Sequence, residues 1–221
     1  MRSINAARRT ALLVAIQNHG CSEKIVQLLL THGADLSGTA PYCGTLLCTA
    51  AANSWVAIAQ LLLDAGADPK VSKYDGCTPL HSATQNDSEE MMGLLLEHGA
   101  DPHWQAINSY GGTPLCYGAA SGSTAIVRLL LDAGADPKVS GYKGRTPLHS
   151  AAQNGSEEMT RLLLEHGADP QAIESDGDTP LRYAAERGSV AIVRLLLDAG
   201  ADPKVARNDG FTPLHLSLIH I

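Results

Sequence analysis

A short segment recurs about every 33 residues along almost the whole chain. The tripeptide Thr-Pro-Leu begins at Thr78, Thr113, Thr146, Thr179 and Thr212, and looser versions begin near Thr10 and at Thr45. Gly-Ala-Asp keeps the same step between Gly33 and Gly200, apart from two extra residues before Thr113. A fixed period of this length predicts an array in which each unit packs mainly against its neighbours.

The segment that begins at Thr146 shows what one unit should form. Thr146 is a suitable N-cap, and the proline after it suits the first position of a helix. Small apolar residues follow, including Ala152, and they should let neighbouring helices approach closely. Gly155 can adopt the left-handed conformation that ends a helix. The sequence therefore predicts a short first helix that is packed closely on one side.

A second helix should follow within the same unit, from about 157 to 165. Two glutamates stand in its first turn, where the helix dipole favours negative charge. Three consecutive leucines then make the helix apolar on more than one side, so neighbouring units should enclose it. The residues from Asp169 to Asp178 should form a turn or finger that leads into the next unit.

The 33-residue period with Thr-Pro-Leu-His-x-Ala resembles the ankyrin repeat over about residues 10–215. The resemblance implies an all-α solenoid of helix-turn-helix units with protruding β-turn or hairpin fingers. It also implies that residues 1–221 form a single ankyrin-repeat domain. Six helix-pair repeats would begin near Thr10, Thr45, Thr78, Thr113, Thr146 and Thr179, with a truncated seventh from Thr212.

Composition and charge narrow the class of protein further. The net charge is −7, and no basic stripe is present to bind nucleic acid. The five cysteines include no Cys-x-x-Cys pair, which fits a reducing compartment. Neither a signal peptide nor a run of about 20 apolar residues occurs. We therefore expect a soluble intracellular monomer, cytoplasmic or nuclear, without membrane insertion.

Histidine and cysteine positions argue against catalysis and against metal binding. His81 and His149 share one place in the repeat, the fourth position of the Thr-Pro-Leu-His motif. Cys48, Cys116 and Arg182 stand at the same place in other repeats, and a catalytic or metal-ligand set would not tolerate such exchange. By resemblance, this histidine ties a helix to a finger. The sequence therefore predicts no enzyme, no catalytic residues, no metal and no cofactor.

Ankyrin arrays usually bind partners through finger tips and the exposed side of the first helices, and loops on a rigid scaffold often carry function. The variable positions at these places that we expect to contact a partner protein are Tyr42, Tyr74, Asp75, Trp104, Tyr110, Tyr142, Lys143, Arg145, Asp176, Asp178, Arg187, Asp209 and Phe211. Tyrosine and arginine are favoured interface anchors, and the late acidic tips could orient a partner. Trp104 either anchors the partner or packs over its own finger.

The leading hypothesis is a non-catalytic scaffold that binds another protein. The alternative is the target-recognition arm of a larger multidomain enzyme or signalling ATPase, because a fold does not fix a function. Residues 216–221 resemble the translation of a transposon-end adapter, which would make the chain a fragment of a longer protein. A genuine but unusual terminus is the other interpretation of those six residues.

Overall fold

The computed structural model describes residues 11–17, 22–36, 39–40, 44–73, 75–104 and 112–205. These residues belong to two compact units, residues 1–108 and residues 109–221, and each unit is described by itself. The predicted repeat beginning at Thr212 and the segment 216–221 lie outside the described residues. Whether all repeats form a single domain stays a prediction.

The first unit contains three helix pairs and one short hairpin. Its elements are α1 (Ala11–Gln17), α2 (Glu23–Thr31), β1 (Thr39–Ala40), β2 (Gly44–Thr45), α3 (Leu46–Ala52), α4 (Val56–Asp64), α5 (Pro79–Gln85) and α6 (Glu89–Glu97). The two strands pair antiparallel, with Thr39 opposite Thr45. The first helix of each pair packs on the next first helix, and the second helices α2, α4 and α6 pack in the same order.

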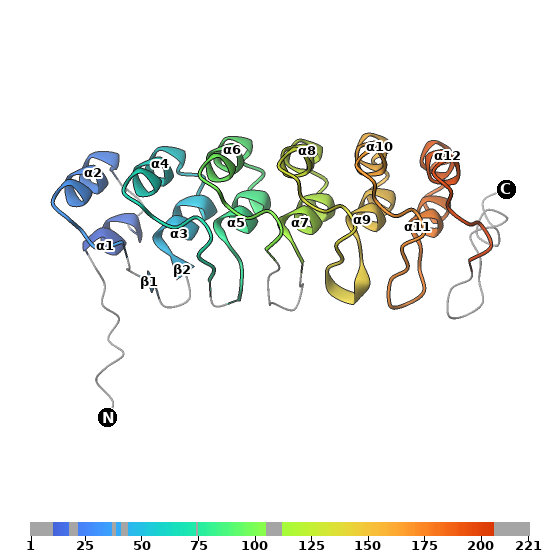
Figure 1. Cartoon of the computed structure of the whole chain (residues 1–221), viewed down its shortest axis with the longest axis horizontal. Coiled ribbons are helices and arrows are strands. Elements are labelled where there is room, and N and C mark those ends of the chain that lie inside the picture. Colours follow the sequence, from blue (N-terminus) through green and yellow to red (C-terminus); the bar gives the residue numbers. More distant parts are fainter. Residues whose placement is uncertain are drawn as a thin grey trace, which may run out of the picture. The chain divides into compact units, whose positions relative to one another are not determined.

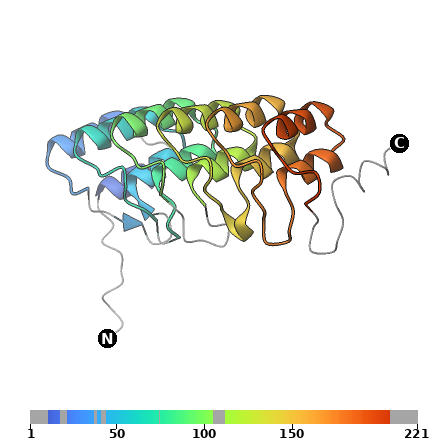
Figure 2. The ribbon, with the colours of Figure 1, turned by 45° about the vertical axis from the view of Figure 1, so that its right-hand side comes forward.

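The second unit repeats this arrangement with three more helix pairs. Its elements are α7 (Pro114–Ser121), α8 (Thr124–Asp132), the 3-10 turn η1 (Tyr142–Gly144), α9 (Pro147–Asn154), α10 (Glu157–Glu165), α11 (Pro180–Glu186) and α12 (Val190–Asp198). Within this unit α9 packs between α7 and α11, and α10 packs between α8 and α12 (Figure 1). The turns after α8 and α10 extend as fingers beyond the row of first helices (Figure 2).

Threonine begins five of the first helices, as the repeat pattern predicts. Thr45 and Thr179 accept a hydrogen bond on Oγ1 from the backbone N–H three residues later, at 3.1 and 3.2 Å. In two other repeats a histidine closes a capping box: the N–H of Thr78 donates to Nδ1 of His81, as Thr146 does to His149. These four helix starts therefore satisfy a backbone group that would otherwise lack a partner.

Left-handed backbone ends the first helix in every repeat from the second to the sixth. Gly122, Gly155 and Gly188 have φ angles of 84°, 74° and 71° at this place. The equivalent residues of the first unit are Ser54 and Asp87, with φ angles of 54° and 53°. A side chain makes this conformation unfavourable, so the two non-glycine residues hold strained turns that glycine would relax.

Small side chains let the first helices approach one another, as predicted from Ala152. That residue is completely buried, and its helix packs against both neighbours in the second unit. Larger apolar side chains fill the space under the second helices, where Ile126, Met159 and Ile192 are also fully buried. The core is therefore a layer between the two rows of helices, and it leaves the far side of the first helices open.

Candidate functional site

Two neighbouring finger tips of the second unit are joined to each other. The backbone N–H and the hydroxyl of Ser175 both donate to the carbonyl oxygen of Lys143, each at 2.7 Å. The Lys143 ammonium also lies 3.4 Å from a carboxylate oxygen of Asp176. Beside this junction, the Tyr142 side chain is exposed to 59%. Two predicted contact residues, Lys143 and Asp176, thus compensate each other's charge.

An apolar hollow of about 230 Å³ lies between this finger and the exposed side of the first helices. Its lining residues are Cys116, Tyr117, Ala120, Gly141, Tyr142, Arg145 and Ser150. Tyr117 and Ala120 come from α7, whereas Tyr142 comes from the finger, so the hollow has walls from both parts of the repeat. A hollow of this composition favours an apolar side chain of a partner.

A second, more polar hollow of about 490 Å³ lies between α9 and α11. Gln153, Tyr183, Glu186 and Arg187 line it. Arg187 is exposed, and its Nε lies 3.0 Å from where a β-carbon on Gly155 would stand, so the arginine reaches the C-terminal end of α9. A helix C-terminus attracts positive charge, which helps to hold the arginine over this hollow.

The Arg145 side chain lines the apolar hollow and contacts Gln153 and Tyr183, two residues that line the polar hollow. Its guanidinium carbon lies 5.0 Å from the centre of the Tyr183 ring, a cation–π arrangement. Arg145 Nε donates to the Ser150 hydroxyl at 3.3 Å, and an Nη donates to the Gln153 side-chain oxygen. Three residues on two helices therefore fix the orientation of this guanidinium before any partner arrives.

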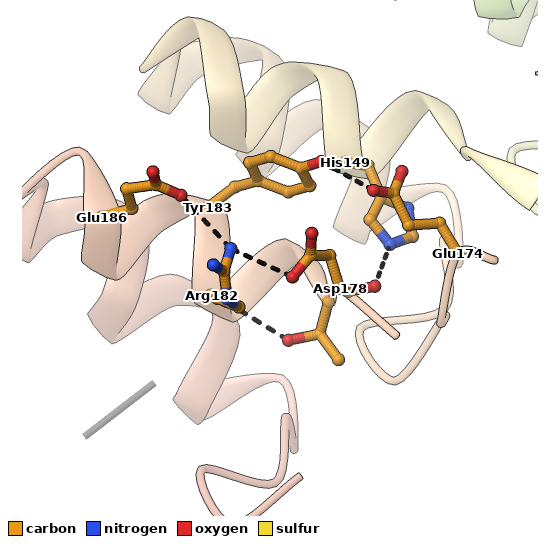
Figure 3. A network of polar contacts seen from close by, with 7 residues as sticks. His149, Glu174, Asp178, Arg182, Tyr183 and Glu186 are labelled. Carbon is orange, nitrogen blue, oxygen red and sulfur yellow. Dashed lines mark hydrogen bonds and ion pairs between the residues drawn. The ribbon is translucent and has the colours of Figure 1, made fainter. Parts of the chain in front are cut away.

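Tyr183 is fixed in turn by a carboxylate behind it. Its hydroxyl donates to a carboxylate oxygen of Glu174 at 2.7 Å (Figure 3). Burial, with this hydrogen bond and the nearby negative charge, raises the pKa of Tyr183 to about 12. The phenol therefore stays neutral, and its ring provides a stable surface beneath Arg145.

The sequence analysis placed Asp178 among the exposed tips, but its side chain is buried. Only 8% of it is exposed, and a carboxylate oxygen lies 3.0 Å from an Nη of Arg182 (Figure 3). The same Nη lies 3.2 Å from Glu186, a carboxylate that is mostly exposed. Arg182 stands where other repeats have histidine, and its guanidinium pairs with the Asp178 carboxylate inside the protein. Asp178 is therefore not available for direct contact with a partner.

In three repeats the residue at the fourth position of the Thr-Pro-Leu-His motif ties its first helix to the following finger, as the resemblance implied for histidine. Nε2 of His149 lies 3.1 Å from the carbonyl oxygen of Asp178. Cysteine makes longer contacts: Sγ of Cys48 lies 3.7 Å from the carbonyl oxygen of Val71, and Sγ of Cys116 lies 3.9 Å from that of Val139. Burial raises the pKa of both thiols, so they remain protonated and can donate.

Trp104 in the first unit packs on a different finger from the one that the sequence suggested. Its indole Nε1–H donates to the carbonyl oxygen of Gly76 at 3.0 Å, which belongs to the preceding finger. The ring nevertheless remains exposed to 37%. Asp75 lies beside this point, where its carboxylate accepts the backbone N–H of Cys77 at 3.0 Å. The tryptophan thus supports one finger and still offers a face to a partner.

Other predicted contact residues cannot be placed. Tyr42, Tyr74, Tyr110, Asp209 and Phe211 lie outside the described residues. The described candidates in the second unit divide into two groups: Tyr142, Arg145 and Arg187 line the hollows, whereas Lys143, Asp176 and Asp178 are paired within the protein.

Sequence reasoning missed two tyrosines of the first helices, Tyr117 and Tyr183. Both stand four residues after the repeat threonine, where the third and fifth repeats have Ser82 and Ser150. An aromatic residue that alternates with serine at one place of a repeat is the signal that could have identified them. Asn154, the last residue of α9, donates to the carbonyl oxygen of Ala119 at 3.0 Å and so joins neighbouring helices.

The described part of the chain contains no group of three or more His, Cys, Asp or Glu residues that could hold a metal ion. Among the same residues, no helix has both the length and the apolar character that a membrane crossing requires.

The fold and the repeated motif define the class of protein. The family described as ankyrin repeats (3 copies) matches residues 12–106, 47–141, 104–174, 137–207 and 171–220. The chain belongs to the ankyrin-repeat family. Domains of this family generally mediate protein–protein interaction and are typically non-catalytic.

Solved structures of other ankyrin repeat domains agree with the family assignment. The chain is similar to the ankyrin repeat domain of human ASB11, with 26% identity, a TM-score of 0.78, and coverage of 93% of this chain and 90% of that one. It is also similar to the ankyrin repeat domain of Bcl-3, a member of the IkappaB protein family. That similarity has 30% identity, a TM-score of 0.74, and coverage of 93% and 92%. No match was found among curated protein sequences.

Proposed function

We propose that this chain is a non-catalytic scaffold that binds a partner protein through its finger tips and the exposed side of its first helices. In the second unit, this surface consists of the apolar hollow, the polar hollow and the joined tips at Lys143 and Ser175. The observation that carries the proposal is the exposed Tyr142 beside the apolar hollow. An exposed aromatic residue at the rim of a preformed hollow is typical of an interface anchor.

Trp104 is a second anchor in this proposal, contributed by the first unit. Its exposed face can contact a partner, while its hydrogen bond to Gly76 keeps the ring in place. Holding a large side chain before binding reduces the entropy lost on association. We expect the scaffold to act as a monomer in the cytoplasm or nucleus, and these two points stay predictions.

The test is a titration of a verified partner against matched variants. Tyr142→Ala should weaken binding by at least about fivefold, because truncation of an anchor usually costs more than about 1 kcal/mol. Val190→Ala is the control, since Val190 is exposed on α12, away from the fingers and first helices. Equal affinities for the parent chain, Tyr142→Ala and Trp104→Ala would place the partner on another surface.

A further inference from the structure

Some of the cationic side chains in and around the two hollows have an ion-pair partner, and others have none. The Arg182 guanidinium lies within 3.2 Å of carboxylates of Asp178 and Glu186. Lys143 is paired with Asp176, as described above. Among the described residues, neither Arg145 nor Arg187 has a carboxylate within 4.0 Å. Two arginines at the surface thus carry positive charge without a counter-charge from this part of the protein.

The nearby acidic groups already have partners within the protein. Glu174 is buried and accepts the Tyr183 hydroxyl, and Asp178 is buried beside Arg182. Glu186 lines the polar hollow, but its carboxylate lies against the same Arg182. The charged side chains named around the hollows therefore sum to zero, and Arg145 and Arg187 are the cations among them that have no ion-pair partner in the described part of the chain.

The apolar hollow adds a second requirement for the ligand. Its volume of about 230 Å³ is below the roughly 300–1,000 Å³ that encloses a drug-sized molecule, so it suits a single side chain. Tyr117 and Tyr142 offer ring surfaces there, and Ala120 leaves room between them. Arg145 forms part of the same wall, so a group next to the inserted side chain would meet its guanidinium.

We propose that the second unit binds an acidic peptide segment that carries a large apolar residue beside a carboxylate. The apolar side chain occupies the hollow at Tyr117 and Tyr142, and carboxylates of the segment pair with Arg145 and Arg187. Arginine suits this role because its guanidinium keeps its charge and has five N–H donors, of which Arg145 uses only two for Ser150 and Gln153. This inference rests on the proposed function, since it names the chemistry of the partner at the same surface.

The experiment uses two display libraries of random 12-residue peptides, selected against the full chain. One library contains all amino acids, and the other lacks Asp and Glu. We expect enriched peptides only from the first library, with Asp or Glu next to Phe, Trp, Tyr, Leu or Ile. Affinities of the synthesised peptides should fall by at least about tenfold when salt rises from 50 to 500 mM, because the charges become screened.

Variants then assign the preference to particular residues. Arg187→Glu should weaken the enriched peptides at least about tenfold and, in a fresh selection, shift enrichment toward Lys and Arg. Arg145→Gln should weaken them similarly, and an unchanged thermal unfolding curve shows that the fold is retained. Arg194→Glu makes the same change of charge on the exposed side of α12 and should leave the affinities unchanged.

Each other outcome overturns the inference. Peptides of equal affinity from the acid-free library, or no enriched peptide from either library, would remove the acidic requirement. Tighter binding of a 12-nucleotide single strand or of a phosphorylated peptide would assign the arginines to phosphate instead. A verified partner that is weakened by Tyr142→Ala but not by Arg187→Glu would overturn this inference and leave the proposed function standing.

Discussion

Nε2 of His149 donates a hydrogen bond to the carbonyl oxygen of Asp178, 29 residues later in the chain. The direction of this bond follows from the other ring nitrogen. Nδ1 accepts the backbone N–H of Thr146 at 3.2 Å, so it carries no proton and Nε2 must carry one. A single neutral imidazole therefore caps α9 and holds the finger that follows it.

The first prediction concerns pH. Burial, chiefly, lowers the pKa of His149 below its ordinary value of 6.5. Above about pH 6.5 the ring is neutral in both the folded and the unfolded chain, so its contribution to stability is complete. As the pH falls below 6.5 the unfolded chain takes up the proton first. The free energy of unfolding should therefore decline until the pH passes below the lowered pKa of the folded protein.

Urea unfolding of the parent chain and of His149→Cys, between about pH 8 and pH 5, measures this contribution. The variant is matched to the chain itself, because Cys116 occupies the same place in a neighbouring repeat. We expect the variant to lose less stability on acidification than the parent chain does. If the free energy of unfolding depended on pH in the same way for both chains, folding would not lower the pKa of His149.

The second prediction concerns the ion pair of Asp178 and Arg182, whose side chains are only 8% and 11% exposed. Arg182→Met should lower the free energy of unfolding by about 3–5 kcal/mol, because it leaves a buried carboxylate without its counter-charge. The double variant Asp178→Asn with Arg182→Met should recover most of that loss. Chemical denaturation measures all three, and a loss below about 0.5 kcal/mol for the single variant would contradict the expectation.

The third prediction compares one turn in two repeats. Ser54→Gly should raise the free energy of unfolding by about 1 kcal/mol, because Ser54 has a φ of 54° and a glycine relaxes this conformation. Gly188→Ser makes the reverse change at the equivalent place, where no atom lies within 4 Å of the added β-carbon. It should be destabilising by a similar amount. Thermal unfolding of both variants would refute the idea if they shifted in the same direction.

The fourth prediction tests the close approach of the first helices. Ala152→Glu should destabilise the second unit by at least about 3 kcal/mol, because the added carboxylate must enter a completely buried contact. It should also broaden the unfolding transition, since α9 connects α7 with α11. Ala191→Glu places the same side chain on the exposed surface of α12 and should have little effect. Cooperative unfolding at the parent midpoint would exclude Ala152 from the core.

The helices were predictable because the information for them is local. Threonine and proline mark the start of four first helices, glycine marks the end of three of them, and the repeated leucines mark the buried side of the second helices. The same reasoning identified Gly155 as left-handed, the resemblance to ankyrin repeats implied that His149 ties helix to finger, and the structure agrees with both. Repetition strengthens such inferences, since each repeat tests the interpretation of the others.

The surface was harder to predict, because it depends on contacts between repeats. Asp178 stands at a tip position in the sequence, but Arg182 from the following helix draws it inward. Lys143 and Asp176 both occupy tips, and only the stacking of two fingers brings their charges together. The apolar hollow combines residues of α7 and α9, and the polar hollow combines residues of α9 and α11. The sequence of a single repeat does not reveal either combination.

The hydrogen bonds between Ser175 and Lys143 have one more consequence. Two fingers that share such bonds cannot rotate independently. Tyr142 and its neighbours therefore belong to a surface that is ordered before a partner binds. A partner that binds there meets a fixed surface, so the protein loses little conformational entropy on binding. Differences in affinity between related partners should then lie mainly in the dissociation rate constant. Changes in the partner's sequence should therefore act chiefly on the lifetime of the complex.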